Sequence, residues 1–142
     1  MKKSHHLTGF YAEALLLAAA FIAVILILTR VFAAAERKSL QASYLTHGVT
    51  LAESTAEAFS AAGDAESLCA LLNESGNASL SGGTVTASYS ADLLPDPDGI
   101  YTVTAVTAEK DDITGCTITV SVGETEVYIL TTAAYSGEEA AR

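Results

Sequence analysis

Apolar residues follow three successive patterns along this 142-residue chain, and each pattern predicts a different kind of element. Ala14 to Thr29 contains no charged residue. Over residues 36–63, apolar residues recur every three to five positions, which is typical of a helix with one buried face. Beyond residue 83, apolar residues alternate with Thr and Ser, which is typical of strands with one buried face.

The first two patterns combine into one long predicted helix, from Phe10 to Ala62. No proline interrupts this range, and a helix of that length is about 80 Å long. Gly48 weakens it by about 1 kcal/mol relative to Ala. The apolar stripe on its second half is too short and too irregular in spacing for a coiled coil. That stripe consists of Leu40, Tyr44, Leu45, Val49, Ala52, Ala56 and Phe59.

A short second helix is predicted over residues 64–73. Gly63 is suited to end the first helix, and Asp64 is suited to cap the second because its carboxylate can accept backbone N–H groups. The stretch SLSGG that follows this helix predicts a loop. The apolar face of the second helix consists of Leu68, Leu71 and Leu72.

Two strands are predicted next. The stretch TVTASYS alternates without error and places Val85, Ala87 and Tyr89 on one face. LLPDPDG predicts a turn region. IYTVTAVTA predicts a second strand, and its phase changes at Ala105–Val106, which indicates a β-bulge.

The stretch CTITVSVGETEVYILTTAAY predicts a β-hairpin in one of two registers. A two-residue turn at 123–124 places Ile118 opposite Ile129, whereas a four-residue loop at 123–126 places Val120 opposite Ile129. Both registers keep apolar residues opposite each other, so the pattern predicts the hairpin and leaves its register open.

The opposite phase of the last strand holds Tyr128, Leu130 and Tyr135, so we expect part of that face to be covered. Together the patterns predict an α+β fold, in which a long N-terminal helix packs on a small antiparallel β-meander of about four strands. The predicted parts are a membrane-spanning half-helix at 10–35, an amphipathic half at 36–63 and an extracytoplasmic α+β head at 64–142.

Charge is distributed unevenly along the chain. Residues 1–38 carry a net charge of +3, and residues 39–142 carry −13. So acidic a domain repels phosphate groups, and we expect no nucleic-acid partner. The basic start MKKSHH favours a cytoplasmic N-terminus, with the C-terminal domain outside the cytoplasm.

The opening segment has three interpretations. As a secretory signal it has a basic start, an apolar middle and a small-residue site at Ala33–Ala35, but Glu13 and Arg30 do not fit that pattern. As an uncleaved membrane anchor it leaves Glu13 at the membrane edge without a partner, which costs free energy. The third interpretation accounts for the acid.

The stretch GFYAEALLLAAAFIAVILIL resembles the start of type IV pilins and of the pseudopilins of type II secretion. Those precursors have a short basic leader ending in Gly, then Phe, then an acid inside a long apolar helix. The resemblance implies that residues 1–9 are a leader, which a prepilin peptidase cleaves between Gly9 and Phe10 before methylating the new terminal amine. It also implies that Glu13 pairs with a neighbouring subunit's terminal amine during assembly.

Glu13 departs from the family pattern by one residue. The family places its acid at the fifth mature position, whereas Glu13 is fourth when counted from Phe10. Such a shift turns a helical side chain by about 100° and moves it about 1.5 Å. The departure has three explanations: an altered pairing between subunits, a minor subunit that departs from the rule, or a chain that the peptidase does not process. A minor subunit is favoured, since major subunits usually keep the fifth position.

The resemblance therefore implies a minor pilin or pseudopilin, a structural subunit of a type IV pilus, competence or type II secretion assembly. Its partners would be other pilin-like subunits through the N-terminal helix, the prepilin peptidase and an inner-membrane assembly platform. It would be a single-pass cell membrane protein that is incorporated into a surface filament.

Two alternatives remain open at this stage. One is an uncleaved single-pass membrane protein with an extracytoplasmic binding domain. The other is a secreted protein cleaved after Ala35, which would leave residues 37–59 as a free amphipathic helix.

No residue pattern predicts an enzyme. The sequence has no nucleophile with a recognisable base, no phosphate-binding glycine pattern, no HExxH and no paired-carboxylate signature. His5 and His6 fall in the leader, and His47 is predicted to be a solvated helix residue. We expect no cofactor apart from one calcium candidate.

That calcium candidate consists of Asp92, Asp96 and Asp98 beside a turn, because oxygen-rich loops can bind Ca²⁺. The EF-hand order is absent, and two prolines alone account for the turn. Cys69 and Cys116 lack the CxxC spacing of a zinc site. They can form one disulfide outside the cytoplasm or remain two buried thiols.

Overall fold

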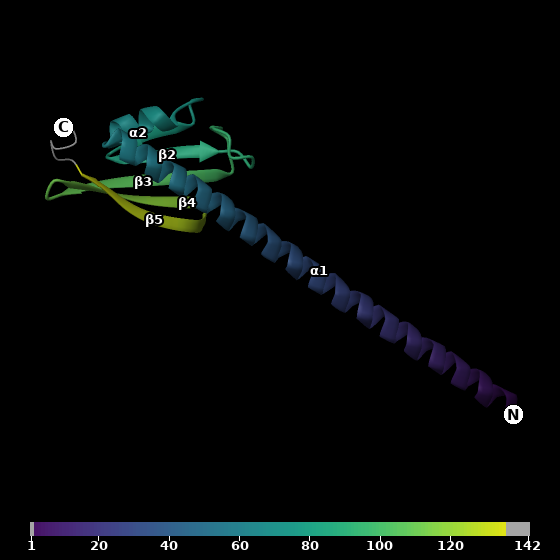
Figure 1. Cartoon of the computed structure of the whole chain (residues 1–142). Coiled ribbons are helices and arrows are strands. Elements are labelled where there is room, and N and C mark those ends of the chain that lie inside the picture. Colours follow the sequence, from purple (N-terminus) through teal and green to yellow (C-terminus); the bar gives the residue numbers. More distant parts are fainter. Residues whose placement is uncertain (1, 136–142) are drawn as a thin grey trace. The chain divides into compact units, whose positions relative to one another are not determined.

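The computed structural model describes the backbone of residues 2–135 and the side chains of residues 7–135. Met1 of the predicted leader and residues 136–142 of the predicted head lie outside these described residues, as do the side chains of His5 and His6. The chain divides into two units, Met1–Gln41 and Ala42–Arg142. Helix α1, Lys2–Ala62, begins in the first unit and ends in the second (Figure 1).

From Lys2 onward, the first unit is one continuous stretch of helix. Every described side chain from Leu7 to Gln41 is exposed, including the large apolar ones. By length and composition, α1 is long and apolar enough to cross a membrane. The Thr29 hydroxyl donates to the Ile25 carbonyl at 2.8 Å, so this polar group is satisfied within the helix.

The second unit is an α+β domain whose sheet has five antiparallel strands in the order β1-β2-β3-β4-β5, which confirms the predicted class. The predicted number of about four strands is too low by one. The stretch SLSGG was expected to be a loop, but its first three residues, 79–81, belong to β1. The strand begins one residue earlier, at Ala78, which pairs with Ala87 and packs on the core. The elements after α1 are α2 (Ala65–Leu72), β1 (Ala78–Ser81), β2 (Thr84–Tyr89), β3 (Tyr101–Lys110), β4 (Ile113–Val122) and β5 (Thr125–Tyr135).

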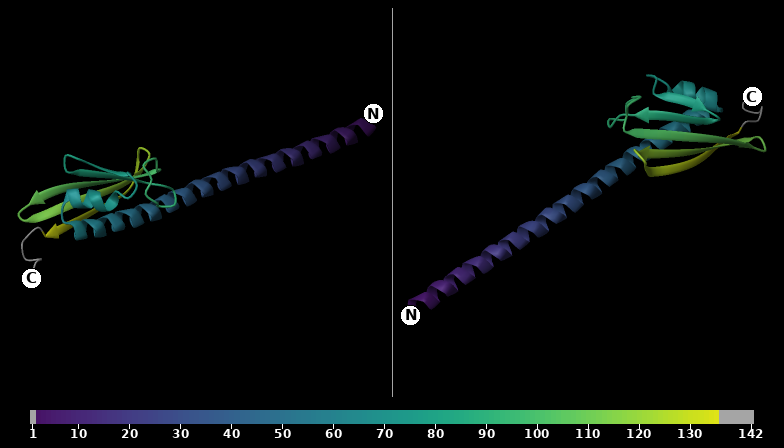
Figure 2. Two further views of the ribbon diagram at one scale, coloured as in Figure 1. Left: turned by 90° about the horizontal axis from the view of Figure 1, so that it is seen from above. Right: turned by 180° about the vertical axis from the view of Figure 1, so that it is seen from behind.

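Within the second unit, one face of the sheet is covered by α1. The two views in Figure 2 show the last turns of this helix on one side of the strands, and no other described element covers the opposite face. The buried helix positions follow the expected spacing of three and four, but Leu40 and Leu45 of the predicted stripe are exposed. The positions that are buried are Gly48, Leu51, Ala52, Thr55 and Phe59.

At Gly48 the backbone of α1 lies close to β5. A Cβ atom at this position would lie 3.2 Å from Val127 Cγ1 and 3.4 Å from Tyr128 Cβ. The glycine that weakens the helix locally therefore lets the helix backbone approach the strand.

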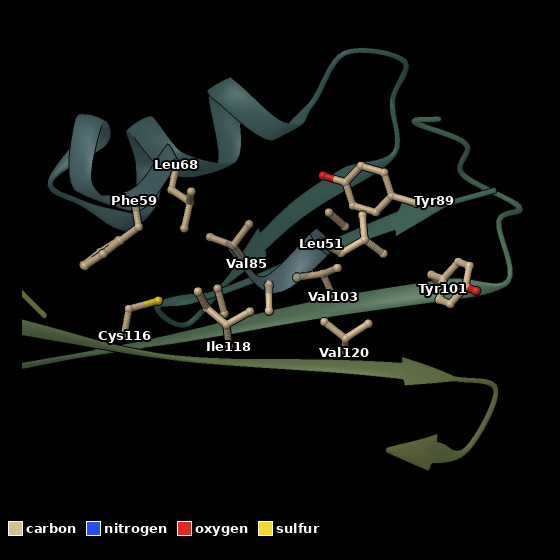
Figure 3. Close-up of a cluster of buried hydrophobic side chains, with 13 residues drawn as sticks. Leu51, Phe59, Leu68, Val85, Tyr89, Tyr101, Val103, Cys116, Ile118 and Val120 are labelled. Carbon is tan, nitrogen blue, oxygen red and sulfur yellow. The ribbon is translucent and has the colours of Figure 1, made fainter. Parts of the chain in front are cut away.

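The core lies between the helices and the covered face of the sheet. Figure 3 shows Phe59 of α1 and Leu68 of α2 above Cys116 and Ile118 of the sheet. Asp64 caps α2 as expected, since its Oδ1 accepts the Ser67 N–H at 2.7 Å. Leu71 was expected to face inward, but it is 52% exposed because this helix of two turns has only a narrow buried face. The strand residues of the core are Val85, Ala87, Tyr89, Tyr101, Val103, Ala105, Cys116, Ile118 and Val120.

The bulge predicted at Ala105–Val106 is wrong. Strand β3 pairs in regular register with β2 and with β4 through both residues. Val106 is simply an exposed apolar residue on the open face. An apolar residue on the solvent side produces the same break in alternation as an inserted residue does, so the pattern alone cannot distinguish them.

The only register shift in the described sheet lies in the β4–β5 hairpin. Val122 pairs with Thr125 across the expected two-residue turn, but the register then shifts between Val120 and Ser121. Beyond the shift Val120 lies opposite Tyr128 and Ile118 lies opposite Leu130, so neither predicted register is right.

The shift changes which phase of β5 meets the helix. Val127 is the extra residue, and it turns Tyr128 and Leu130 toward the core while Ile129 faces outward. The expectation that the second phase of β5 is partly covered is confirmed for Tyr128 and Leu130. It is wrong for Tyr135, which is 78% exposed. This residue lies an odd number of positions after Leu130, so it shares the face of Ile129 and not that of Tyr128 and Leu130.

Candidate functional site

The residues that the sequence singles out for processing and assembly lie together in the first unit. Gly9, Phe10 and Glu13 are all helical and exposed. The side chains of Phe10, Glu13, Ala14 and Leu17 border an open hollow of about 300 Å³ on one helix face. Their spacing of three, four and seven residues explains this, because such positions share one face.

Glu13 is an isolated charge in this unit. Its helical neighbours three and four positions away are Gly9, Phe10, Leu16 and Leu17, none of which carries a charge. Among residues 7–135, no cation pairs with the Glu13 carboxylate. A carboxylate on an apolar surface is costly to bury unless an opposite charge joins it.

Gly9 has no structural reason to be glycine. A Cβ atom built there meets nothing within 4 Å, and the residue has no positive φ. In a helix interior it costs about 1 kcal/mol relative to Ala. The residue is thus conformationally expendable, in contrast to Gly48.

Arg30 lies near the other end of the apolar segment, 17 residues after Glu13. It too is exposed, and its neighbours three and four positions away are Leu26, Ile27, Ala33 and Ala34. Among residues 7–135, no acidic side chain pairs with it.

The three aspartates of the calcium candidate do not form a metal site in the described structure. No group of three or more His, Cys, Asp or Glu side chains is placed to hold a metal ion among the described residues. Asp96 Oδ1 instead accepts the Asp98 N–H at 2.9 Å, and the Asp96 carbonyl accepts the Gly99 N–H at 3.0 Å. The Asp96 side chain thus serves the turn itself.

Cys69 and Cys116 are free thiols in the structure, and both pack in the core of the head. Cys69 is half-buried, whereas Cys116 is fully buried. Burial raises the pKa of the Cys116 thiol to about 11, because the low-polarity surroundings disfavour the thiolate. Cys116 is therefore a poor nucleophile.

His47 is not the solvated residue that the sequence predicts. It is half-buried, and its Nδ1 lies 2.8 Å from the hydroxyl of buried Tyr101. Tyr44 and His47 both contact the Tyr101 ring edge-on, with centroids 6.1 and 5.7 Å away. Burial raises the pKa of Tyr101. The pair satisfies a buried hydroxyl, and no local sequence signal could reveal a contact between residues 54 positions apart.

Asn77 is the other functional-looking residue that the structure explains. It begins an Asn-Ala-Ser glycosylation pattern, yet its side chain is only 5% exposed. The side chain accepts the N–H groups of Glu74 and Ser75 and donates to the Ser88 carbonyl at 3.1 Å. These bonds join the end of α2 to β2, so the amide is structural.

Comparison with protein-family models, curated proteins and solved structures finds no match to this chain. Function must therefore be argued from the two units themselves.

Proposed function

We propose that this protein is a minor pilin or pseudopilin, a structural subunit of a type IV pilus, competence or type II secretion assembly. The observation that supports this most directly is the uneven use of one helix. The described side chains of α1 before residue 42, from residue 7 onward, are all exposed and mostly apolar, whereas the part after it supplies part of the core of a small acidic head. An apolar surface this large needs a membrane or other copies to cover it.

In this proposal the apolar segment spans the membrane until the subunit is assembled. Ala14 to Thr29 is about 24 Å long, and snorkelling of Arg30 extends its reach toward the roughly 30 Å of a hydrocarbon core. The acidic head then lies outside the cytoplasm. The proposed role as a structural subunit requires no enzyme active site.

Gly9 and Phe10 form the processing site in this proposal. Glycine at position 9 costs helix stability and packs against nothing, so the residue is better explained by recognition than by folding. A protease needs its target in an extended form, and a helical glycine unwinds more easily than Ala. After cleavage, Glu13 would pair with the terminal amine of a neighbouring copy, which removes the cost of an isolated carboxylate.

The structure removes one objection to the alternative of a secreted protein. Cleavage after Ala35 was expected to leave a free amphipathic helix, but Leu51, Ala52 and Phe59 of that helix belong to the core of the head. That objection is therefore wrong. The remaining arguments against a secretory signal are Glu13 and Arg30.

The deciding experiment is the intact mass of the mature protein recovered from membranes of cells that carry a prepilin peptidase. We expect a chain that begins at Phe10 and carries one methyl group. Gly9→Ala serves as the matched variant, since its Cβ meets nothing within 4 Å, and a reduced yield of the Phe10 chain would show that the glycine is read by the peptidase. A chain beginning at Met1 supports the uncleaved anchor, and one beginning at Glu36 supports the secreted protein.

A further inference from the structure

The first unit contains two charged side chains, Glu13 and Arg30, that lie within or at the edge of its apolar segment. Glu13 and Arg30 are each surrounded by apolar helical neighbours, and neither is paired among residues 7–135. They are 17 residues apart in an unbroken helix, which separates them by about 25 Å along the axis and about 100° around it. Two charges so far apart on a straight helix cannot pair with each other within one copy.

We propose that Glu13 of one copy pairs with Arg30 of a second, parallel copy that is displaced by about 17 residues along the helix axis. The inference rests on the proposed function, because it requires several copies to pack through their N-terminal helices. Its basis is charge complementarity between two single charges on an otherwise apolar surface. Arg30 would be expensive to bury alone and much less expensive when paired, and a carboxylate has enough acceptor positions to bind a guanidinium beside the terminal amine.

Other cations of the chain fit Glu13 less well. Arg37 and Lys38 lie beyond the apolar segment, next to Glu36, where water can solvate them. Of these three cations, Arg30 alone has long uncharged and mostly apolar stretches on both sides, from Ala14 to Thr29 and from Val31 to Ala35. Guanidinium also suits this role, because it remains charged and can bind both carboxylate oxygens.

The displacement distinguishes the membrane state from the assembled state. Side by side at equal depth in a membrane, two copies hold their Glu13 residues at one edge and their Arg30 residues near the other. Moving one copy outward by about 25 Å brings its Glu13 level with Arg30 of the copy behind it. The pair therefore forms only when a subunit leaves the membrane plane.

The same geometry excludes a closed assembly of parallel copies. A contact that relates copies by a translation along the axis uses different surfaces on the two partners and repeats without closing. Each copy offers Glu13 to one neighbour and Arg30 to another, which yields an open helical filament. The pairing adds to the proposed terminal-amine contact, since that amine comes from a copy with a smaller displacement.

The test is disulfide crosslinking of the full-length chain in membranes and sheared filaments of its own cells. Leu17→Cys and Ala34→Cys are combined in a Cys69→Ser background. Each new cysteine lies four residues, about one helical turn, after Glu13 or Arg30, so the two cysteines keep the 17-residue spacing. Buried Cys116 is retained. We expect a ladder of dimers and higher oligomers on oxidation, since each chain bonds two different neighbours.

Two controls make the result specific. The mismatched pair Leu17→Cys with Leu40→Cys should give no ladder, and Arg30→Gln should reduce the matched ladder about tenfold while Arg37→Gln leaves it unchanged. A matched ladder that stops at dimers would show antiparallel closed pairs and overturn the proposal. A ladder from the mismatched pair would assign Glu13 to a cation beyond the apolar segment and overturn it too.

The N-terminal mass of the same samples separates this inference from the proposed function. A chain that begins at Phe10 and enters filaments without the matched crosslink keeps the pilin-like function and overturns the 17-residue displacement. A matched ladder from chains that still begin at Met1 supports the displacement and rejects processing.

Discussion

At the scale of single residues, Gly99 shows how backbone contact fixes a residue type. Its backbone runs against that of Tyr89 and Ser90, where Pro95 forms an isolated bridge with Tyr89. A Cβ atom there would overlap the Tyr89 carbonyl group and lie 2.8 Å from the Ser90 nitrogen. Neither neighbour can move aside as a flexible side chain would.

We therefore expect Gly99→Ala to lower the free energy of unfolding by about 2–4 kcal/mol. Urea denaturation of the head gives this value. Gly115→Ala is the matched control, because its Cβ would make only an ordinary contact of 3.6 Å with the Ala108 carbonyl. Equal stability of the two variants would mean that the loop between β2 and β3 adjusts freely.

Cys116 gives the head a pH dependence on the alkaline side. Its pKa is raised from 9.0 to about 11 by burial, so between these values the unfolded chain loses the thiol proton that the folded chain keeps. The contribution of this thiol to the free energy of unfolding is fully present below about pH 9. It falls as the pH rises from there, by about 1 kcal/mol per pH unit.

The free energy of unfolding, measured between pH 8 and pH 10 in steps of about one pH unit, checks this expectation. Cys116→Ala should flatten the profile below pH 10. Burial also raises the pKa values of Tyr89 and Tyr101, which start from 10.0, so their effect has the same sign but belongs to higher pH. An unchanged slope in the variant would show that Cys116 is not the titrating group.

At the scale of elements, α1 is one helix with two kinds of surface. Before residue 42 all its described side chains are exposed, and after it Gly48, Leu51 and Phe59 face the sheet. The change needs no break in the backbone, because helix continuity depends on local hydrogen bonds whereas burial depends on what lies beside the helix. The sequence pattern therefore predicted the helix from Phe10 onward and its end before Gly63 correctly. It predicted neither the start of the helix at Lys2 nor which stripe positions are covered.

Strand β5 shows the opposite case, where one inserted residue decides which side chains are buried. Val127 shifts the register, so Tyr128 and Leu130 face the helix and Ile129 faces outward. Because side chains alternate with a period of two, a shift by one residue exchanges the two faces of the strand. Both faces of β5 hold apolar residues, so hydrophobicity alone could not have fixed the register.

At the scale of the whole molecule, the last third of α1 is part of the head and not an appendage to it. Leu51, Ala52, Thr55 and Phe59 are buried against the sheet and α2. We expect residues 36–142 to unfold cooperatively on heating, as followed by circular dichroism. Residues 64–142 should lack that transition, because the covered face of the sheet would then be open to water.

The opposite outcome, a cooperative transition in residues 64–142 at a similar temperature, would mean that the sheet is stable without the helix. A chain of residues 36–142 carrying Phe59→Ala is the intermediate variant. It should remain folded but lose about 3–5 kcal/mol.

The sequence by itself determined the features that depend on near neighbours. The helix ending at Gly63, the cap at Asp64, the inward residues of β2 and the exposed apolar segment with its single acid all follow from local periodicity and local hydrogen bonding. The tertiary structure alone decided the bulge at Val127, the contact between His47 and Tyr101, and the burial of Asn77. Each of these depends on which atoms from distant parts of the chain meet, and a one-dimensional pattern of apolar and polar residues does not contain that information.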